Sequence, residues 1–472
     1  MLMSVLAVAL AACQSTRIAS EPQPIVKTDI PQTFTALPQP EQPSIAAQGY
    51  QEFFADQRLK DLIALALQNN RDLRVAALNV EKVQQQYRIA YNGLLPTVGA
   101  NAGITQSGNS SQSNTSYNVN LGVTNYELDF WGRVASLKDA ALDNYFATRA
   151  AQDSTQVALI GQIAMAWVNL SYAEQNLALA EQTLKTQQQA LDLNQKRFNA
   201  GITSELPVSQ ARVSVETARG DVANNKTQIQ QAKNALNLLA GQVVPNNLLP
   251  TRAVQSITNN TVLNAGLPSE LLNNRPDLQG SEYRLRAAGA NITAARARLF
   301  PSISLTGSAG LASTSLSDLF SSGAFVWRLA PSVDLPIFDW GTRQANVKVN
   351  ETEQKIALAN YEKAIQTAFR EVNDVLATRA NIGDRIAAQQ RLVAATNSAY
   401  RIADARFKAG LDNYLSVLSA QQNNYNVEKG LLALQQAQIN SQIELYKTLG
   451  GGATLMKSPT NPTPVSTTPK SP

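Results

Sequence analysis

Residues 197–201 read Arg-Phe-Asn-Ala-Gly, and residues 406–410 read Arg-Phe-Lys-Ala-Gly, 209 positions later. The Trp-Gly pair at 131–132 returns at 340–341 with the same spacing. Two other landmarks return in the same order: Asn-Asn-Arg at 69–71 and 273–275, and Leu-Pro-Thr at 95–97 against Phe-Pro-Ser at 300–302. A repeat of about 200 residues is too long for a solenoid unit of 20–50 residues. It indicates a duplicated half-chain.

The composition of the chain excludes several classes of function. The 472 residues carry a formal net charge of +5 without a basic cluster, which argues against a nucleic-acid partner. Histidine is absent, which removes the commonest general base and the commonest metal ligand. The single cysteine, Cys13, excludes an intrachain disulfide and a Cys-ligated zinc site. We therefore expect no enzyme activity, no metal site and no resident cofactor.

The N-terminus has the pattern of a bacterial lipoprotein signal. Residues 1–12 are mostly apolar and lead into Leu10-Ala11-Ala12-Cys13, which resembles the lipobox. We expect cleavage before Cys13 and a diacylglycerol with an N-acyl chain on that residue; an ordinary buried cysteine is the alternative. A signal peptide carries a positive n-region, and none precedes this segment. We therefore expect the true start to lie upstream of Met1.

Four segments alternate apolar and polar residues with the period of two that indicates β-strands. They fall within two pairs, at 97–127 and 302–336. Each segment has about ten residues, the length of a tilted strand that crosses a bilayer. Arg328 and Asp334 share the polar face of the last segment, whereas the apolar face carries no charge. This pattern is typical of an outer-membrane barrel, with the turns at 107–116 and 312–322 outside the cell. A soluble sandwich with one wet face is the alternative.

Four strands cannot close a barrel by themselves. An open sheet edge in lipid would leave backbone groups unpaired, so we expect the barrel to be shared between chains. Two, three or four copies would give eight, twelve or sixteen strands. An eight-stranded barrel is filled by its own side chains, so a conduit favours three copies or more.

Two very long helices are predicted, at 135–198 and 343–407. Each stretch lacks proline, contains one glycine and would be about 95 Å long. Apolar residues at seven-residue spacing predict left-handed coiled-coil packing: Leu177, Leu184, Leu191 and Phe198, then Ile386, Val393, Tyr400 and Phe407. Shorter helices are predicted at 56–92, 206–239, 268–298 and 415–448. Since two short helices match one long helix in length, we expect them to stack end to end beside it.

These elements define the expected organisation of the chain. The predicted parts are a signal peptide (1–12), a lipidated extended leader (13–55), a first repeat (56–239), a linker (240–267), a second repeat (268–448) and a C-terminal segment with a disordered tail (449–472). The leader, linker and C-terminal segment should form an equatorial belt around the helices. Trp131 and Trp340 mark the strand-to-helix crossings, where aromatic residues suit a membrane–water interface; packing at a bend is the alternative.

The chain resembles the TolC-like outer-membrane factors, and within them the lipidated multidrug efflux channels of the OprM and AdeK (AdeC) type. The residues that carry the resemblance are the lipobox at 10–13, residues 126–132, the duplicated Arg-Phe-x-Ala-Gly, and residues 334–341 and 445–452. The resemblance covers nearly all of the mature chain. It implies a mixed α+β membrane protein: a homotrimer with a twelve-stranded outer-membrane barrel, four strands per chain, continued by a periplasmic α-helical barrel.

The resemblance also implies the function and partners. The trimer would be the passive exit duct of a tripartite multidrug efflux pump, with a periplasmic adaptor and an inner-membrane RND transporter as partners. In lipoproteins of this kind an Asp after the cysteine favours the inner membrane, so Gln14 is consistent with the outer membrane. Channels of the same family that secrete proteins (type I) or export metal ions are the alternative, and a soluble coiled-coil scaffold is a more distant one.

The helix tips are the functional positions that the resemblance identifies. The docking motif of the adaptor matches Ala200-Gly201-Ile202 and Ala409-Gly410-Leu411, where the family often has Val in place of the Ala. The gate would use an apolar ring at Leu415 and an acidic ring four residues on, where this chain has Ser419. Three further residues could supply polar gating contacts, although helix capping is the alternative for each: Arg406, Asp412 and Tyr414.

Overall fold

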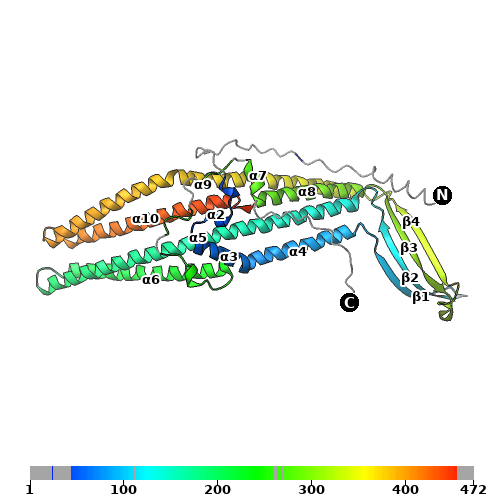
Figure 1. Cartoon of the computed structure of the whole chain (residues 1–472), viewed down its shortest axis with the longest axis horizontal. Helices are drawn as coiled ribbons and strands as arrows, with labels where there is room; N and C mark the ends of the chain where they lie inside the picture. Colours follow the sequence, from blue (N-terminus) through cyan, green and yellow to red (C-terminus); the bar gives the residue numbers. More distant parts are fainter. Residues whose placement is uncertain are drawn as a thin grey trace. The chain divides into compact units, whose positions relative to one another are not determined.

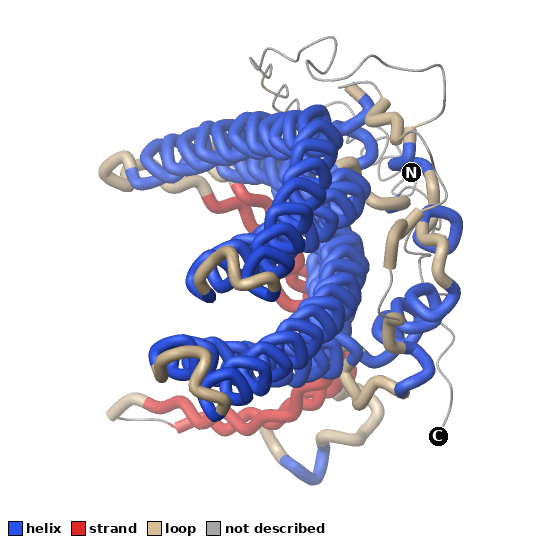
Figure 2. Tube along the Cα trace, turned by 90° about the vertical axis from the view of Figure 1, so that its left-hand side faces the viewer, coloured by secondary structure: helices blue, strands red, loops and turns tan. Residues whose placement is uncertain are grey.

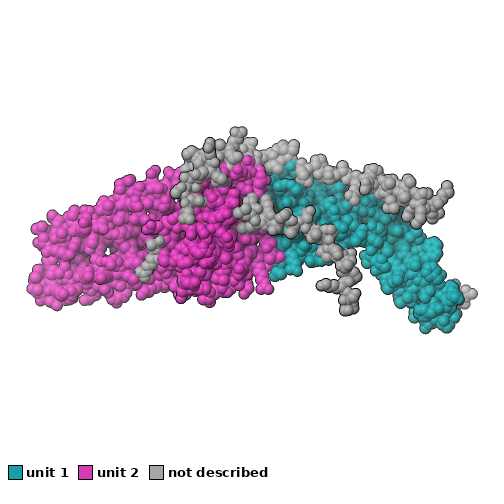
Figure 3. Space-filling view, viewed as in Figure 1, with its two compact units in different colours: residues 1–28, 78–150, 279–364 teal, residues 29–77, 151–278, 365–472 magenta. Residues whose placement is uncertain are grey.

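The computed structural model describes residue 24 and residues 44–110, 113–251, 254–258, 263–266 and 269–453. The expected lipidation site at Cys13 lies outside these residues. The described chain forms two compact units (Figure 3). The first contains residues 78–150 and 279–364, and the second contains the remaining described residues from 44 onwards.

The first unit contains a four-stranded antiparallel sheet in the order β1-β2-β3-β4 (Figure 1). Its strands are β1 (Val98–Gly108), β2 (Ser113–Glu127), β3 (Ser302–Ser313) and β4 (Phe325–Asp334). The strands β2 and β3 pair with each other, so the sheet joins the two sequence halves. In the described residues β1 and β4 each pair on one side only, as expected for a sheet that is not closed within one chain.

The strand register sorts the side chains onto two faces. One face carries the row Ala100–Leu121–Ala309–Trp327 and its apolar neighbours. The other carries the row Gly99–Gly122–Ser308–Arg328. A β-bulge lies between Val123 and Tyr126, where Asn125 adopts φ 54° and donates its N–H to the Thr306 hydroxyl at 3.1 Å. The bulge bends β2 at this point. Between Tyr117 and Val123 the pairing stays regular, so the apolar and polar faces remain separate there.

The long helices are α5 (Arg133–Asn199) and α9 (Thr342–Lys408), each slightly longer than predicted. An aspartate starts both of them. The Asp129 carboxylate accepts the N–H groups of Val134 and Ala135 at 2.9 and 2.8 Å. Asp339 likewise accepts the N–H of Arg343 at 3.2 Å and pairs with its guanidinium at 2.7 Å. Capping of this kind satisfies the free N–H groups of a helix start.

Two predicted single helices are each divided in the structure. The helix expected at 56–92 becomes α3 (Gln57–Asn69) and α4 (Arg71–Asn92), because Asn70 is extended and its side chain caps Leu73 N–H at 2.9 Å. The helix expected at 268–298 becomes α7 (Glu270–Asn274) and α8 (Pro276–Ala297). Pro276 excludes the helical conformation at the preceding Arg275. The other two short helices are α6 (Leu206–Ala240) and α10 (Tyr414–Thr448).

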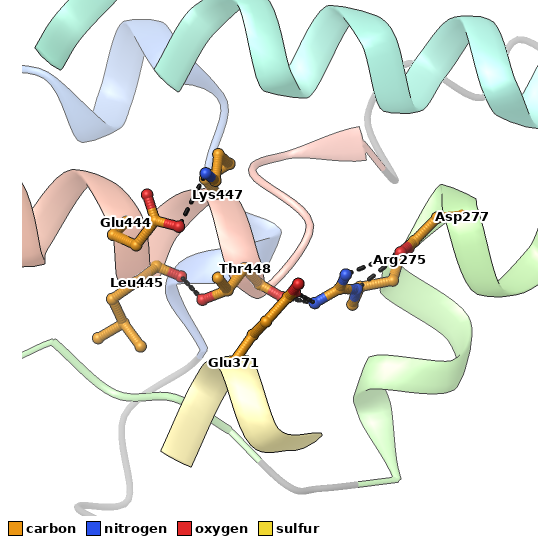
Figure 4. A network of polar contacts seen from close by, with 7 residues as sticks. All are labelled: Arg275, Asp277, Glu371, Glu444, Leu445, Lys447 and Thr448. Atoms are coloured by element: carbon orange, nitrogen blue, oxygen red, sulfur yellow. Dashed lines mark hydrogen bonds and ion pairs between the residues drawn. The ribbon is translucent and has the colours of Figure 1, made fainter. Parts of the chain in front are cut away.

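The second unit contains the two junctions where short helices meet end to end. In the first, Asn70 donates its side-chain amide to the carbonyl of Leu239 at 2.9 Å. In the second, Arg275 donates to the carbonyl of Thr448 at 3.1 Å and to Glu371 at 2.8 Å (Figure 4). Asn70 and Arg275 therefore occupy equivalent places. The two Asn-Asn-Arg triplets are identical in sequence with an offset of 204 residues. In the structure the equivalent residues, Asn70 and Arg275, are 205 residues apart, so the sequence match is shifted by one residue from the spatial match.

Each junction also contains a glycine that no other residue could replace without a shift of the backbone. Gly241 has φ 71°, and a Cβ there would lie 2.2 Å from the carbonyl oxygen of Asn69. Gly450 has φ 101°, and a Cβ there would lie 2.4 Å from the carbonyl oxygen of Asn274. Both features favour glycine. The duplication thus extends to the backbone of the junction, although the side chain that ties it differs.

Segments of the predicted belt pack together in the second unit. Ile45 N–H bonds the carbonyl of Asn264 at 3.1 Å, and Gly452 N–H bonds that of Ala46 at 3.1 Å. Trp167 is fully buried and donates to the Leu248 carbonyl at 3.0 Å. Tyr446 stacks on Phe53 with ring centroids 4.2 Å apart. The described parts of the leader, the linker and the C-terminal segment therefore share one core with the helices. Among the described helices, none combines the length and apolarity that a membrane crossing requires.

Candidate functional site

The candidate site lies at the tips of two helical hairpins in the second unit. The hairpins are formed by α5 with α6 and by α9 with α10, and their short loops lie at one end of the unit (Figure 2). The predicted tip residues lie in these loops or on the helix turns next to them. The duplicated Arg-Phe-x-Ala-Gly stretches form the ends of the two outgoing helices.

Both outgoing helices end in the same hydrogen-bonded turn. Ile202 N–H bonds the carbonyl of Arg197 at 2.9 Å, and Gly201 N–H bonds that of Phe198 at 2.9 Å. The second tip repeats this pattern, since Leu411 N–H bonds the carbonyl of Arg406 at 2.9 Å. This is a Schellman motif, which requires a left-handed residue. The glycines supply it with φ 70° at Gly201 and 74° at Gly410.

The turns present apolar side chains to solvent. Ile202 and Leu411, which follow the two glycines, are each 67% exposed. Leu206 and Leu415, the apolar residues at the starts of the returning helices, are also exposed. Among the described residues, no heavy atom beyond the adjacent chain lies within 4 Å of a Cβ built at either tip glycine. Both tips therefore offer exposed apolar side chains with free space around the turn.

The returning helices start differently in the two tips. In α10 the Asn413 side chain accepts the Ser416 N–H at 3.1 Å and caps the helix. In α6 the cap residue, Glu205, makes no such bond, and Pro207 lies in the first turn. A proline is tolerated at this position because the first N–H groups of a helix have no partner within the helix. The first tip therefore depends on backbone stiffness and the second on a side-chain cap.

The predicted gate residues occupy two different environments. Leu415 and Ser419 are exposed on α10, four residues apart and therefore on one helix face. Arg406 pairs with Asp412 at 2.6 Å across the turn of its own hairpin, so in this chain the two side chains neutralise each other.

Tyr414 does not present a polar group to solvent. It is buried and packs against the Phe407 ring at 5.5 Å between centroids. Its hydroxyl has no hydrogen-bond partner among the described residues. Burial, with a smaller effect of Tyr400, raises the pKa of Tyr414 to about 12. The structure thus places Tyr414 in the core that holds the hairpins together, where it cannot supply the polar contact expected of it.

Two contacts between the hairpins have no counterpart in the sequence prediction. Arg197 of the first hairpin lies over the Phe407 ring, 4.7 Å from its centroid, and donates to the Phe407 carbonyl at 3.3 Å. Further along, the Tyr425 hydroxyl bonds the Asp221 carboxylate at 3.2 Å. Burial and this carboxylate raise the pKa of Tyr425 to about 12. Each of these contacts ties the two hairpins to each other.

The available sequence signal for the Arg197 contact is a difference between the repeats. Arg406 has an acid in its own turn, Asp412, whereas the matching position of the first tip is Thr203. Arg197 therefore has no carboxylate at the position that pairs with Arg406, and it reaches the other hairpin. Of the two equivalent arginines, Arg406 therefore makes its ion pair within its own turn, whereas Arg197 makes its contact with the other hairpin.

The two tryptophans at the strand-to-helix crossings also differ. Trp131 is half-buried, donates to the Pro301 carbonyl at 2.7 Å and stacks on Phe300 at 4.7 Å. Trp340 is 87% exposed with φ 56° and touches only Phe338 among the described aromatic rings. Trp131 fits the alternative of packing at a bend, whereas Trp340 has the exposure that an interface residue needs.

Comparison with known proteins identifies this architecture. The family model described as "Outer membrane efflux protein" matches residues 62–242 and 267–451. The chain is 39% identical over 416 residues to the probable efflux pump outer membrane protein TtgC of Pseudomonas putida, covering 86% of each chain. It is 42% identical over 410 residues to the solvent efflux pump outer membrane protein SrpC of the same species, covering 85% of this chain and 87% of SrpC.

A solved structure agrees with the sequence comparison. The crystal structure of the open state of the Neisseria gonorrhoeae MtrE outer membrane channel matches with a TM-score of 0.84 and 38% identity. The match covers 93% of this chain and 98% of that one. The strands, long helices and tips described above therefore belong to a known channel architecture.

Proposed function

The chain belongs to the outer membrane efflux protein family, and from that premise we propose that three copies form the passive exit duct of a tripartite multidrug efflux pump. The observation that supports this most directly is the open four-stranded sheet with one apolar and one polar face. Such a sheet cannot lie in lipid with free edges, so β1 of one copy would pair with β4 of the next. Three copies would close a twelve-stranded barrel around a pore wide enough for small molecules.

The duct would open to the periplasm through the hairpin tips. The exposed apolar residues Ile202 and Leu411 would accept the helical hairpins of a periplasmic adaptor, which links the duct to an inner-membrane RND transporter. Selectivity would come from the width and the lining charge of the pore, and the transporter would supply the energy. Leu415 would form the apolar constriction, with Ser419 where related channels carry an acid.

The N-terminus would anchor the trimer. A diacylglycerol and an N-acyl chain on Cys13 would add a lipid tether to the barrel in the outer membrane. Incorporation of labelled palmitate tests this, because Cys13→Ser should abolish the label. A lipid that is retained in that variant would contradict the assignment.

The proposed function is tested in a strain that has the pump and the adaptor but lacks its own channel. Expression of this chain should restore resistance to antibiotics and solvents. A photo-crosslinking residue at Ile202 or Leu411 should capture the adaptor, whereas one at Leu238, exposed on α6 far from its tip, should not. Restoration of metal resistance or protein secretion without drug resistance would favour the other cargoes. A chain that fractionates as a soluble protein would contradict the proposal altogether.

A further inference from the structure

The polar face of the sheet carries one cation, and its surroundings suit an anion. Arg328 is the only Lys or Arg in the four strands. Its side chain is exposed and makes no hydrogen bond or ion pair in the described part of the chain. An unpaired guanidinium on a strand that faces a pore is a free donor for carboxylates and other oxyanions.

The residues around Arg328 leave its guanidinium uncovered. Its row across the sheet contains only small residues, since Ser308 lies directly opposite, Gly122 follows on β2 and Gly99 on β1. Together with their neighbours they line a hollow of about 640 Å³ on this face. The rest of the lining is uncharged and consists of small, polar and apolar residues: Ala100, Asn101, Asn120, Val123, Thr124, Thr306, Gly307, Ala330 and Ser332. The site therefore has one charge and many hydrogen-bonding groups.

The two acidic residues within the four strands do not neutralise this charge. Asp334 lies on the same face but six residues along β4, which corresponds to roughly 20 Å of strand. Glu127, at the end of β2, is engaged by Arg133 at 2.5 Å. At physiological salt a separation of roughly 20 Å exceeds twice the screening length of about 8 Å. The field near Arg328 is therefore that of an isolated positive charge.

We propose that Arg328 forms a cationic ring inside the barrel that attracts the anionic groups of cargo, carboxylates and sulfonates in particular. This inference rests on the proposed trimeric duct, which places three copies of Arg328 at one height around the pore. A barrel of twelve strands tilted by about 40° has a backbone diameter of roughly 24 Å. Each guanidinium then lies within about one screening length of the axis. An anionic molecule that passes this height meets all three charges.

The test measures the local potential beside Arg328 and does not depend on the state of the tips. Ser308→Cys places a thiol opposite Arg328 in a Cys13→Ser background, and the trimer in outer membranes is exposed to thiosulfonate reagents from outside. The measured quantity is a ratio: the rate at which the anionic ethylsulfonate reagent modifies the thiol, divided by the rate for the cationic trimethylammonium reagent. We expect Arg328→Gln to lower this ratio about fivefold. Arg328→Lys should leave it nearly unchanged, and Arg328→Glu should lower it further.

A control cysteine outside the pore distinguishes failure of the cationic ring from failure of the proposed duct. Ser322→Cys lies in the loop before β4, about 20 Å of chain from Arg328, and its ratio should not change. A ratio at Ser308→Cys that is the same whether Arg328 is present or replaced by Gln would overturn the cationic ring while leaving the duct intact. Failure of both reagents to reach Ser308→Cys, with normal labelling of Ser322→Cys, would overturn the pore assignment of this face and thus the duct itself.

Discussion

Replacement of Arg275 by Gln should destabilise the second unit by about 1–5 kcal/mol, the sum of one buried hydrogen bond and two partly exposed ion pairs. Arg275 is 9% exposed and holds the carbonyl of Thr448 together with the carboxylates of Asp277 and Glu371. Loss of the partner of a buried carbonyl costs about 1–3 kcal/mol. The side chains of Asp277 and Glu371 are 42% and 36% exposed, so water can replace the arginine and each loss costs only about 0–1 kcal/mol.

The measurement is the apparent midpoint of thermal unfolding of the purified protein in detergent, read for several variants under one heating rate. Arg71→Gln is the control, because Arg71 is exposed and matches Arg275 in the sequence repeat but not in space. We expect Arg275→Gln to lower the midpoint clearly and Arg275→Lys to lower it less, with Arg71→Gln unchanged. Equal effects at positions 71 and 275, or none at 275, would refute the view that the buried arginine ties α10 to α7.

The remaining predictions concern the tips and one titratable group. Glu at Gly201 or Gly410 should strain the left-handed turn and reduce drug resistance without loss of the trimer; unchanged resistance in both variants would count against docking there. Ser419→Asp should restore the acidic ring and lower the single-channel conductance of the purified protein, and an unchanged or higher conductance would argue against a missing ring. Burial raises the pKa of Asp143 from 3.8 to about 6, so its contribution to stability is complete below about pH 4 and is lost as the pH rises through 6. Asp143→Asn should therefore stabilise the half-buried site by on the order of 1 kcal/mol at pH 7.5 and hardly at all at pH 4 in thermal unfolding, and an equal effect at both pH values would contradict this.

The sequence predicted the elements whose signal is periodic. Strict alternation and long proline-free stretches indicated the four strands and the two long helices to within two residues at each helix end. The duplication located both tip glycines, because a left-handed helix end strongly favours glycine. These features depend on local geometry, which a single chain segment determines.

The sequence did not predict what depends on contacts between distant segments. The break at Asn70 is a side-chain cap within an otherwise helical pattern, and nothing in the periodicity marks it. The contact of Arg197 with Phe407 depends on the separation of two hairpins that are 210 residues apart in the chain. Tyr414 looks like a polar surface residue beside the turn, but it is buried against the Phe407 ring. In each case the deciding partner is remote in sequence or hidden from the periodic pattern.

The central claim, a barrel shared by three copies, is tested most directly by crosslinking between the edges of the sheet. Pairs of cysteines, one on β1 (98–108) and one on β4 (325–334), are introduced into a Cys13→Ser chain and oxidised in isolated outer membranes. We predict that the pairs in register give covalent species of two and three chains and nothing larger, because the third copy closes the ring. Monomers at every register, or an open ladder beyond three chains, would contradict the claim.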